Sequence, residues 1–325
     1  MMHLSHGKLS AWYHQLGQQL GAGLPLPDAL RASRGAGIPS ETLNAMAAAI
    51  SAGGNTNDAL NASAGRLPPA DRVSLAASAL AGRMPQTLQA LSVRHAQLAA
   101  AKMKTVLACL YPAAVLHLGL LLLPIVRMID WEKGFAWDAV AYARGLAFTL
   151  LPLWTAAIFI GVFMRRQNSV TLRLLQKLPI VGTYFRTQSL SDFSFTLGNL
   201  LEAGVPIDRA WSMAGLSSRS PQLKAAAKSM GLVIARGEQP GAALEALHCF
   251  PPEFAALYRT GEMSGQLDQN LQRLSALNQE QAQRALSLAA MVYPGLMFIA
   301  VAAGVAYFVI SVYGGYLKML TEMAG

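Results

Sequence analysis

One short segment combines residue types that could do chemistry. Residues 260–268 read TGEMSGQLD, and they place the carboxylate of Glu262 and the hydroxyl of Ser264 among two glycines that are four residues apart. Such glycines are typical of a tight turn between helices, with Ser264 as a possible cap. A turn does not require a carboxylate. Glu262 therefore either binds a basic residue of a partner or locks the two helices together.

The histidines do not gather into a recognisable site. We interpret His3, His6 and His14 as part of a frayed terminus, and we place His95 and His248 in helical segments. His117 stands alone in an apolar segment, where ionisable side chains are costly and often functional. It is either an intramembrane proton site or a neutral hydrogen-bonding side chain. Because the apolar segments offer no charged partner, the neutral interpretation is favoured.

Motifs for the common catalytic chemistries are missing from the chain. It has no G-x-x-x-x-G-K-[ST] loop for ATP hydrolysis, no H-E-x-x-H pair for zinc and no G-x-S-x-G nucleophile turn. Cys109 and Cys249 are expected on different sides of the membrane boundary, so neither a disulfide nor a thiolate site is expected. We therefore expect no catalytic, cofactor-binding or metal-binding residues.

The elements that must position these residues occur twice. Residues 16–25 (LGQQLGAGLP) return as residues 197–206 (LGNLLEAGVP), and the two copies stay in near register for about ninety residues. Within each copy, glycine and proline interrupt the apolar periodicity at short intervals; Gly204, for example, ends one helix and Pro206 begins the next. This pattern predicts an all-α fold with five or six helices per copy and no strands.

Three segments are long and apolar enough to cross a membrane. With 53% hydrophobic and 13% charged residues, the chain is too apolar for an ordinary soluble protein. The predicted transmembrane helices cover residues 105–127, 144–164 and 285–317, each reaching the roughly 20 residues that a bilayer requires. The third is longer than needed, so it either tilts or begins as a cytoplasmic helix.

Lysine and arginine predict the orientation. They are concentrated in residues 1–104 and 165–284, which makes both polar segments cytoplasmic helical domains, while the loop 128–143 and the tail 318–325 face the periplasm. The first thirty residues lack the apolar core of a signal peptide. Trp131, Trp137 and Tyr142 are the aromatics expected at the membrane interface. The net charge of +9 fits orientation and lipid contact, and we expect no nucleic-acid partner because no basic run is interleaved with aromatics.

Taken together, these residues resemble the type II secretion F / type IV pilus platform family. The resemblance rests on the duplication, the three apolar segments, and the residues Leu197 to Pro206 with Ala210, Gly261-Glu262, Ser264-Gly265-Gln266-Leu267 and Tyr293-Pro294. It implies a bacterial inner-membrane protein without catalytic activity. The implied role is to couple a cytoplasmic assembly ATPase to the insertion or extraction of pilin-like subunits.

The resemblance also implies partners and contact residues. The partners are a hexameric secretion or pilus assembly ATPase, pilin or pseudopilin subunits, other inner-membrane assembly proteins, membrane lipid and further copies of the chain. Partner contacts are expected at Glu262, Ser264, Gly265, Gly204 and Pro206. Gly295 and Gly304 permit close helix packing in the membrane, within one subunit or between subunits.

The chain departs from the family pattern in two places. Residues 81–88 of the first copy read AGRMPQTL, which we interpret as a shortened form of the pattern with Arg83 at the position of the acid, so that the first turn has lost a partner contact. The chain also opens almost directly on the first repeat, without the leading segment of many longer members.

Two other functions stay open. The first is a transporter or channel, suggested by the repeat and by prolines in the apolar segments, although the lack of intramembrane Asp, Glu, Lys or Arg speaks against ion coupling. The second is a membrane enzyme in which Glu262 and His248 cooperate.

Overall fold

A computed structural model gives the fold of the chain. It describes residues 4–33, 35, 37–63, 65–126, 128–130, 134–135, 137–166 and 179–324. The chain divides into two compact units. The helix-bundle unit comprises Met1–Met103 and Gln176–Arg284, and the apolar unit comprises Lys104–Leu175 and Ala285–Gly325.

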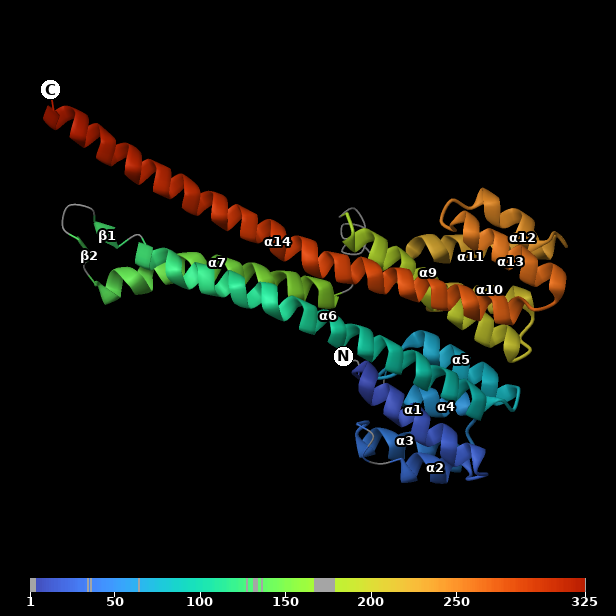
Figure 1. The fold of residues 1–325 in the computed structure, drawn as a ribbon. Helices are drawn as coiled ribbons and strands as arrows, with labels where there is room; N and C mark the ends of the chain where they lie inside the picture. Colours follow the sequence, from blue (N-terminus) through green and yellow to red (C-terminus); the bar gives the residue numbers. More distant parts are fainter. Residues whose placement is uncertain are drawn as a thin grey trace. The chain divides into compact units, whose positions relative to one another are not determined.

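The helix-bundle unit contains the same succession of helices twice (Figure 1). The first copy consists of α1 (His6–Gly21), α2 (Leu26–Ala32), α3 (Ser40–Ser51), α4 (Thr56–Ala62), α5 (Pro69–Leu80) and the start of α6 (Met84–Val126). The second consists of α9 (Val181–Glu202), α10 (Ile207–Ser217), α11 (Pro221–Ala235), α12 (Pro240–Ala243) with the 3₁₀ turn η1 (Leu244–Ala246), α13 (Pro252–Ser264) and the start of α14 (Leu267–Ala324). The predicted all-α fold is confirmed.

Glycines in the left-handed region end equivalent helices. Gly23 (φ +88°) follows α1 and Gly204 (φ +77°) follows α9, and a proline then precedes α2 and α10. Gly82 (φ +68°) and Gly265 (φ +69°) end α5 and α13 in the same way. A side chain would strain the backbone at these four positions, because glycine adopts left-handed φ values at little cost and residues with a Cβ do not.

These glycines correct the expected alignment of the copies. Gly82 is the counterpart of Gly265, not of Gly261, since both have positive φ at the C-terminal end of equivalent helices. Counting back from them, the counterpart of Glu262 is Ala79, and Arg83 stands opposite Gln266. The pattern in the first copy is therefore not shortened. It lacks the acid without having an arginine in its place.

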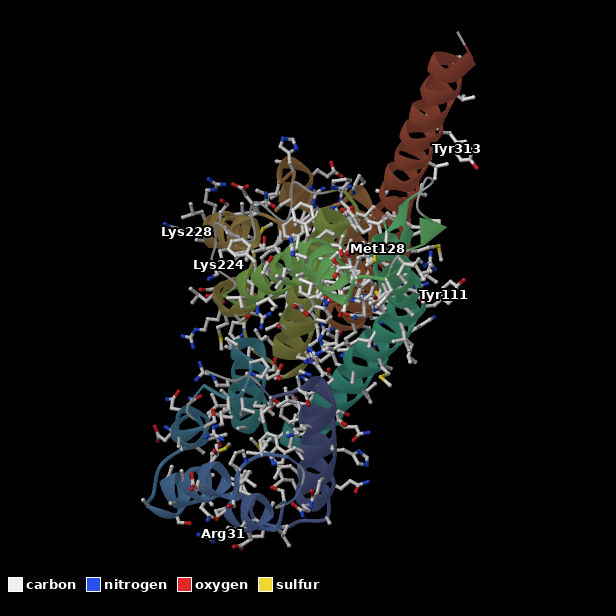
Figure 2. All side chains as sticks on the ribbon, turned by 90° about the vertical axis from the view of Figure 1, so that its left-hand side faces the viewer. Arg31, Tyr111, Met128, Lys224, Lys228 and Tyr313 are labelled. Atoms are coloured by element: carbon white, nitrogen blue, oxygen red, sulfur yellow. The ribbon has the colours of Figure 1, made fainter. Side chains whose placement is uncertain are left out.

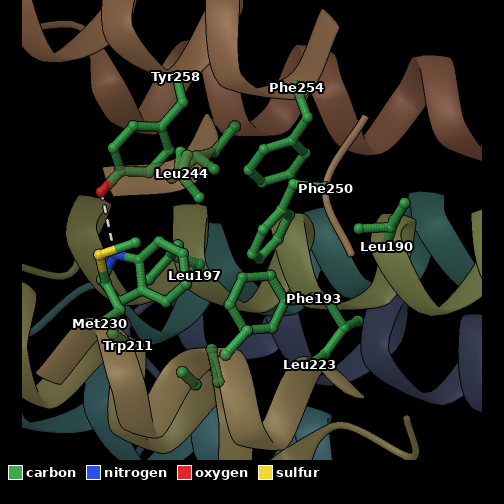
Figure 3. Close-up of a cluster of buried hydrophobic side chains, with 14 of the residues drawn as sticks. Leu190, Phe193, Leu197, Trp211, Leu223, Met230, Leu244, Phe250, Phe254 and Tyr258 are labelled. Carbon is green, nitrogen blue, oxygen red and sulfur yellow. Dashed lines mark hydrogen bonds between the residues drawn. The ribbon is translucent and has the colours of Figure 1, made fainter. Parts of the chain in front are cut away.

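Each copy has its own apolar core. The second core gathers aromatic side chains from α9, α10 and α13 around aliphatic ones, as Figure 3 shows for Phe193, Trp211, Phe254 and Tyr258. Trp211 Nε1 donates to the Tyr258 hydroxyl at 3.0 Å, which satisfies the one polar group of a buried indole. The first core is built in the same way around Trp12, Tyr13 and the leucines of α1 to α6. Helix α5 packs against α9 and α10, so the two copies are in contact.

The apolar unit contains the second half of α6, the helix α7 (Ala139–Arg166) and the larger, C-terminal part of α14. Among the described residues, one helix, Met84–Ile125, is long and apolar enough to cross a membrane. Large apolar side chains on it are exposed, including Tyr111 at 77%, which is labelled in Figure 2. Exposure of this kind would be unfavourable in water and is expected of a helix that faces lipid.

The loop before α7 contains a short hairpin that the sequence did not predict. Strand β1 (Ile129–Asp130) pairs antiparallel with β2 (Gly134–Phe135), and Ile129 stands opposite Phe135. Two-residue strands are too short to show the alternation of apolar and polar residues that predicts a strand. Trp131 lies outside the described residues, whereas Trp137 and Tyr142 place their ring centroids 5.3 Å apart.

Candidate functional site at the junction of the two copies

The first and last helices of each copy cross at a glycine. A Cβ added to Gly198 in α9 would lie 3.3 Å from Leu271 Cβ in α14, and one added to Gly17 in α1 would lie 3.2 Å from Leu88 Cβ in α6. Gly17 is the counterpart of Gly198, and Leu88 that of Leu271. The same close helix approach therefore occurs in both copies.

At each crossing, two serines donate hydrogen bonds to each other's backbone carbonyl, and we call this pair the serine clasp. Ser10 Oγ donates to the Ser92 carbonyl at 2.9 Å, and Ser92 Oγ donates back to the Ser10 carbonyl at 3.0 Å. In the second copy, Ser191 and Ser275 exchange the same two bonds at 2.8 and 3.0 Å. The serines occupy equivalent positions of the two copies, so a comparison of the repeats at these positions would have found them.

Arg94 of α6 connects the first copy to the second. Its guanidinium lies 2.5 Å from Asp192 Oδ1, donates to Ser275 Oγ at 2.8 Å and to Ser191 Oγ at 3.3 Å, and stands 4.3 Å from the centre of the Phe195 ring. The Arg94 side chain is only 11% exposed. In the sequence, Arg94 is only one of the lysines and arginines of residues 1–104 that predict the orientation, whereas in the structure it forms an ion pair between the copies.

His95, the next residue on α6, belongs to a buried polar network of the first copy. Asp71 Oδ2 accepts from the Tyr13 hydroxyl at 2.8 Å and from His95 Nε2 at 2.9 Å. His6 Nδ1 lies 2.8 Å from His95 Nδ1, with the two rings stacked. The interpretation of His6 as part of a frayed terminus is therefore wrong. It opens α1, and its ring packs on α6.

Burial affects the ionisation of this network. Removal from water, assisted by the neighbouring His95, lowers the pKa of His6 to about 4. Burial and the nearby Asp71 raise the pKa of Tyr13 well above its usual range. Both shifts favour the uncharged form of the side chain.

A groove of about 690 Å³ lies between the copies, with α6, α9 and α14 as its walls. Its lining is mostly small or uncharged, with glutamines from both copies. The charged groups Arg94 and Glu202 have partners inside the chain, Glu202 accepting from Gln272 Nε2 at 2.7 Å. The lining residues are Pro85, Gln86, Thr87, Gln89, Ala90, Val93, Arg94, Gln97, Phe195, Glu202, Gln272, Ser275, Ala276 and Gln279.

Glu262 connects α13 to α12. Its Oε2 accepts from the backbone N–H of Gly241 at 3.0 Å, in the first turn of α12. In the first copy, the backbone N–H groups at the start of α4 are satisfied locally, by a capping box of Asn55 and Asp58. Gln239, at the N-cap of α12, makes no such bond, so Glu262 supplies from a neighbouring helix what the local sequence lacks. The bond joins α13 to α12 and not to α14, so it is a different contact from the predicted lock between the two helices that flank the turn.

The other predicted contact residues form turns. Ser264 ends α13 and donates to the Gly261 carbonyl at 3.4 Å, so it is not a cap of α14. Gly265 and Gly204 end helices, and Pro206 precedes α10. Ser264 and Gly265 are exposed, and the neighbouring Met263 is 75% exposed. The α13–α14 turn therefore offers an accessible surface, whereas Glu262 is half-buried.

The remaining candidates are His117, His248 and the two glycines of the third apolar segment. His117 Nδ1 donates to the Ala113 carbonyl of its own helix at 2.7 Å, and its ring stands edge-on to Trp154. This bond agrees with the hydrogen-bonding interpretation of His117. A Cβ on Gly295 or Gly304 would meet no described atom within 4 Å, so the described contacts assign no packing role to either glycine. No hydrogen bond is described between His248 and Glu262.

Comparisons with known proteins cover both copies. Residues 12–129 and 193–315 match the model of the family described as type II secretion system (T2SS), protein F. A type II secretion system protein F of Pseudomonas aeruginosa is 32% identical over 168 residues, which are 50% of this chain and 38% of that protein. The type 4 fimbrial assembly protein PilC of Pseudomonas putida is 29% identical over 40% of this chain and 32% of its own.

A third relative has a different name. It is the protein transport protein HofC homolog of Escherichia coli K12, 27% identical over 51% of this chain and 43% of its own. The matched segments span less than half the length of each of these three relatives. The family match, in contrast, includes most of both helical copies and the apolar segments that follow them. The chain therefore belongs to the family of type II secretion system protein F.

Proposed function

We propose that this protein is a non-enzymatic inner-membrane assembly platform of a type II secretion or type IV pilus machine. The observation that carries the proposal is the family match over both copies. The names of the relatives, which refer to secretion, fimbrial assembly and protein transport, support it. A duplicated helical bundle attached to apolar helices suits a scaffold, because it offers a large surface to partners.

The proposed topology has three transmembrane helices, over residues 105–127, 144–164 and 285–317. The first is supported by the length and composition of Met84–Ile125. Residues 1–104 and 165–284 form the cytoplasmic domains, with the N-terminus inside, and residues 128–143 and 318–325 face the periplasm. Lysine and arginine near the segment ends support this orientation.

In the proposed mechanism, an assembly ATPase acts on the helix-bundle unit and the movement reaches pilin-like subunits through α6 and α14. Support comes from the bounds of these helices, since each begins in the helix-bundle unit and extends into an apolar segment. A continuous helix transmits displacement along its axis because its backbone hydrogen bonds keep the rise per residue fixed.

We place one partner contact at the α13–α14 turn. The exposure of Met263, Ser264 and Gly265 supports this placement. Glu262 acts there as a positioning residue, because its carboxylate holds α12 against α13. Lipid, other inner-membrane assembly proteins and further copies of the chain complete the set of proposed partners.

The test is purification from the native host in mild detergent, through a tag on the N-terminus, with mass spectrometry of bound proteins. Recovery of a secretion or pilus ATPase together with pilin-like subunits is the expected result. Met263→Asp should reduce ATPase recovery. Glu262→Ala should reduce it less, and Glu262→Gln, which keeps an acceptor for Gly241, least of all.

The matched control is Glu253→Ala, since Glu253 is exposed in the first turn of the same helix, α13. Equal recovery of the ATPase with the wild type and with Met263→Asp would show that the partner contact does not lie at this turn. Recovery of no ATPase and no pilin-like subunit, from a host that expresses such a machine, would contradict the platform proposal. Ion and solute flux in liposomes would then test the transporter alternative.

A further inference from the structure

Side chains from one turn of α6 bond to neighbouring helices on three sides. Ser92 forms the serine clasp with α1, His95 bonds to Asp71 of α5, and Arg94 bonds to residues of α9 and α14. Ser92 and His95 bind elements of the first copy, and Arg94 binds elements of the second. This turn lies about 15 Å before the apolar segment at residue 105, at 1.5 Å per residue.

The Arg94 contact is specific to the junction between the copies. Counting from the aligned glycines, the counterpart of Arg94 in the second copy is Leu277, which is 41% exposed, and the counterpart of Asp192 in the first copy is Ala11. The serine clasp, in contrast, is present in both copies. The ion pair is thus not a product of the duplication. Within the described parts of the chain, the ion pair joins α6 to α9, and the same guanidinium bonds to α14.

Arg94 also reaches into the second serine clasp. The hydroxyls of Ser191 and Ser275 both accept from its guanidinium while they bond to each other's backbone carbonyl. The position of α6 and the crossing of α9 with α14 are therefore coupled through the same atoms. Arginine suits this role because its planar fork serves several acceptors at once and stacks on an aromatic ring.

We infer that Arg94 is a positioning residue that makes the two copies move as one body with α6. Without its guanidinium, only the packing of α5 on α9 and α10 and the bond from Arg83 to the Glu202 carbonyl hold the copies together among the contacts described, so the first copy moves more against the second and the α9–α14 crossing loosens. Only the functional consequence rests on the platform proposal: a partner that pushes on either copy would then move both α6 and α14. The structural inference stands or fails independently of it.

The test measures the distance between the copies in the full-length protein in lipid nanodiscs. Spin labels are attached at Glu41→Cys in α3 and Lys228→Cys in α11, both exposed, after replacement of Cys109 and Cys249. The parent protein should give one narrow distance distribution. Arg94→Leu, which installs the residue of the second copy, should broaden it, and amides of residues 190–200 and 270–279 should exchange hydrogen about tenfold faster.

Three further variants make the test specific. Arg31→Leu removes an exposed ion pair with Asp28 inside the first copy and should change neither readout. Arg94→Asp combined with Asp192→Arg should restore part of the narrow distribution. Asp192→Asn leaves the buried guanidinium without its carboxylate, and it provides the same test if Arg94→Leu does not fold. A narrow distribution and unchanged exchange in Arg94→Leu or Asp192→Asn would overturn the inference, whatever the secretion phenotype.

Discussion

His6 and His95 share a hydrogen bond within the first copy, and this contact has a consequence for pH. The groups that act on His6 are His95 and Lys102 of α6, Asp71 of α5 and Asp192 of α9. The two carboxylates raise its pKa, but burial and the two bases outweigh them. Because the folded pKa is about 4 and the unfolded pKa about 6.5, the unfolded state binds more protons between these values.

The sign of this linkage predicts acid sensitivity. The full stability of the folded state is present above pH 6.5 and declines as the pH falls toward 4. We expect the apparent melting temperature in detergent to fall over this window, and to fall less in His6→Gln, which has no proton to take up. His14→Gln is the control, since His14 is an exposed residue of the same helix. An equal fall in melting temperature between pH 6.5 and pH 4 for the wild type and His6→Gln would contradict the prediction.

At the scale of the element, the close helix crossings depend on the absence of a side chain. Gly17→Ala and Gly198→Ala would each place a Cβ 3.2 to 3.3 Å from a buried leucine Cβ of the crossing helix. Both leucines are fully buried, so the added Cβ requires the neighbouring atoms to shift in a packed core. We expect a loss of about 1 to 3 kcal/mol for each substitution, as is typical of overpacked cores, measured as a lower melting temperature.

Gly231→Ala provides the contrast. Gly231 lies inside α11, and a Cβ there would meet nothing within 4 Å. Alanine is favoured over glycine in a helix by up to about 1 kcal/mol, so this variant should be as stable as the wild type or more so. A melting temperature for Gly198→Ala that equals that of Gly231→Ala would show that the crossing tolerates a wider separation.

The limits of prediction from sequence are also clearest at this scale. Local signals such as Gly204 followed by Pro206 place helix ends, and apolar runs identify the long helices, because both effects act within a few residues of the chain. The partners of Arg94 and Glu262 and the stacking of His6 on His95 depend on helices that are distant in sequence. A single arginine or histidine gives no sign of them.

At the scale of the whole molecule, the distribution of lysine and arginine predicts the proposed orientation in the membrane. Single cysteines at Ala139→Cys, next to the short hairpin, and at Lys228→Cys in the helix-bundle unit should differ in access to a membrane-impermeant maleimide. In intact spheroplasts, with Cys109 and Cys249 replaced, we expect labelling at position 139 only. Permeabilisation should expose position 228. Labelling of position 228 before permeabilisation would reverse the proposed topology.

The most direct test of the platform role is deletion of the gene in a host that has no second family member. Surface pili and secreted proteins would be quantified in the deletion strain, in a strain complemented with the wild type and in one complemented with Arg31→Leu as a neutral control. We predict loss of piliation or secretion on deletion and full recovery in both complemented strains. Unchanged piliation and secretion in the deletion strain would contradict the account.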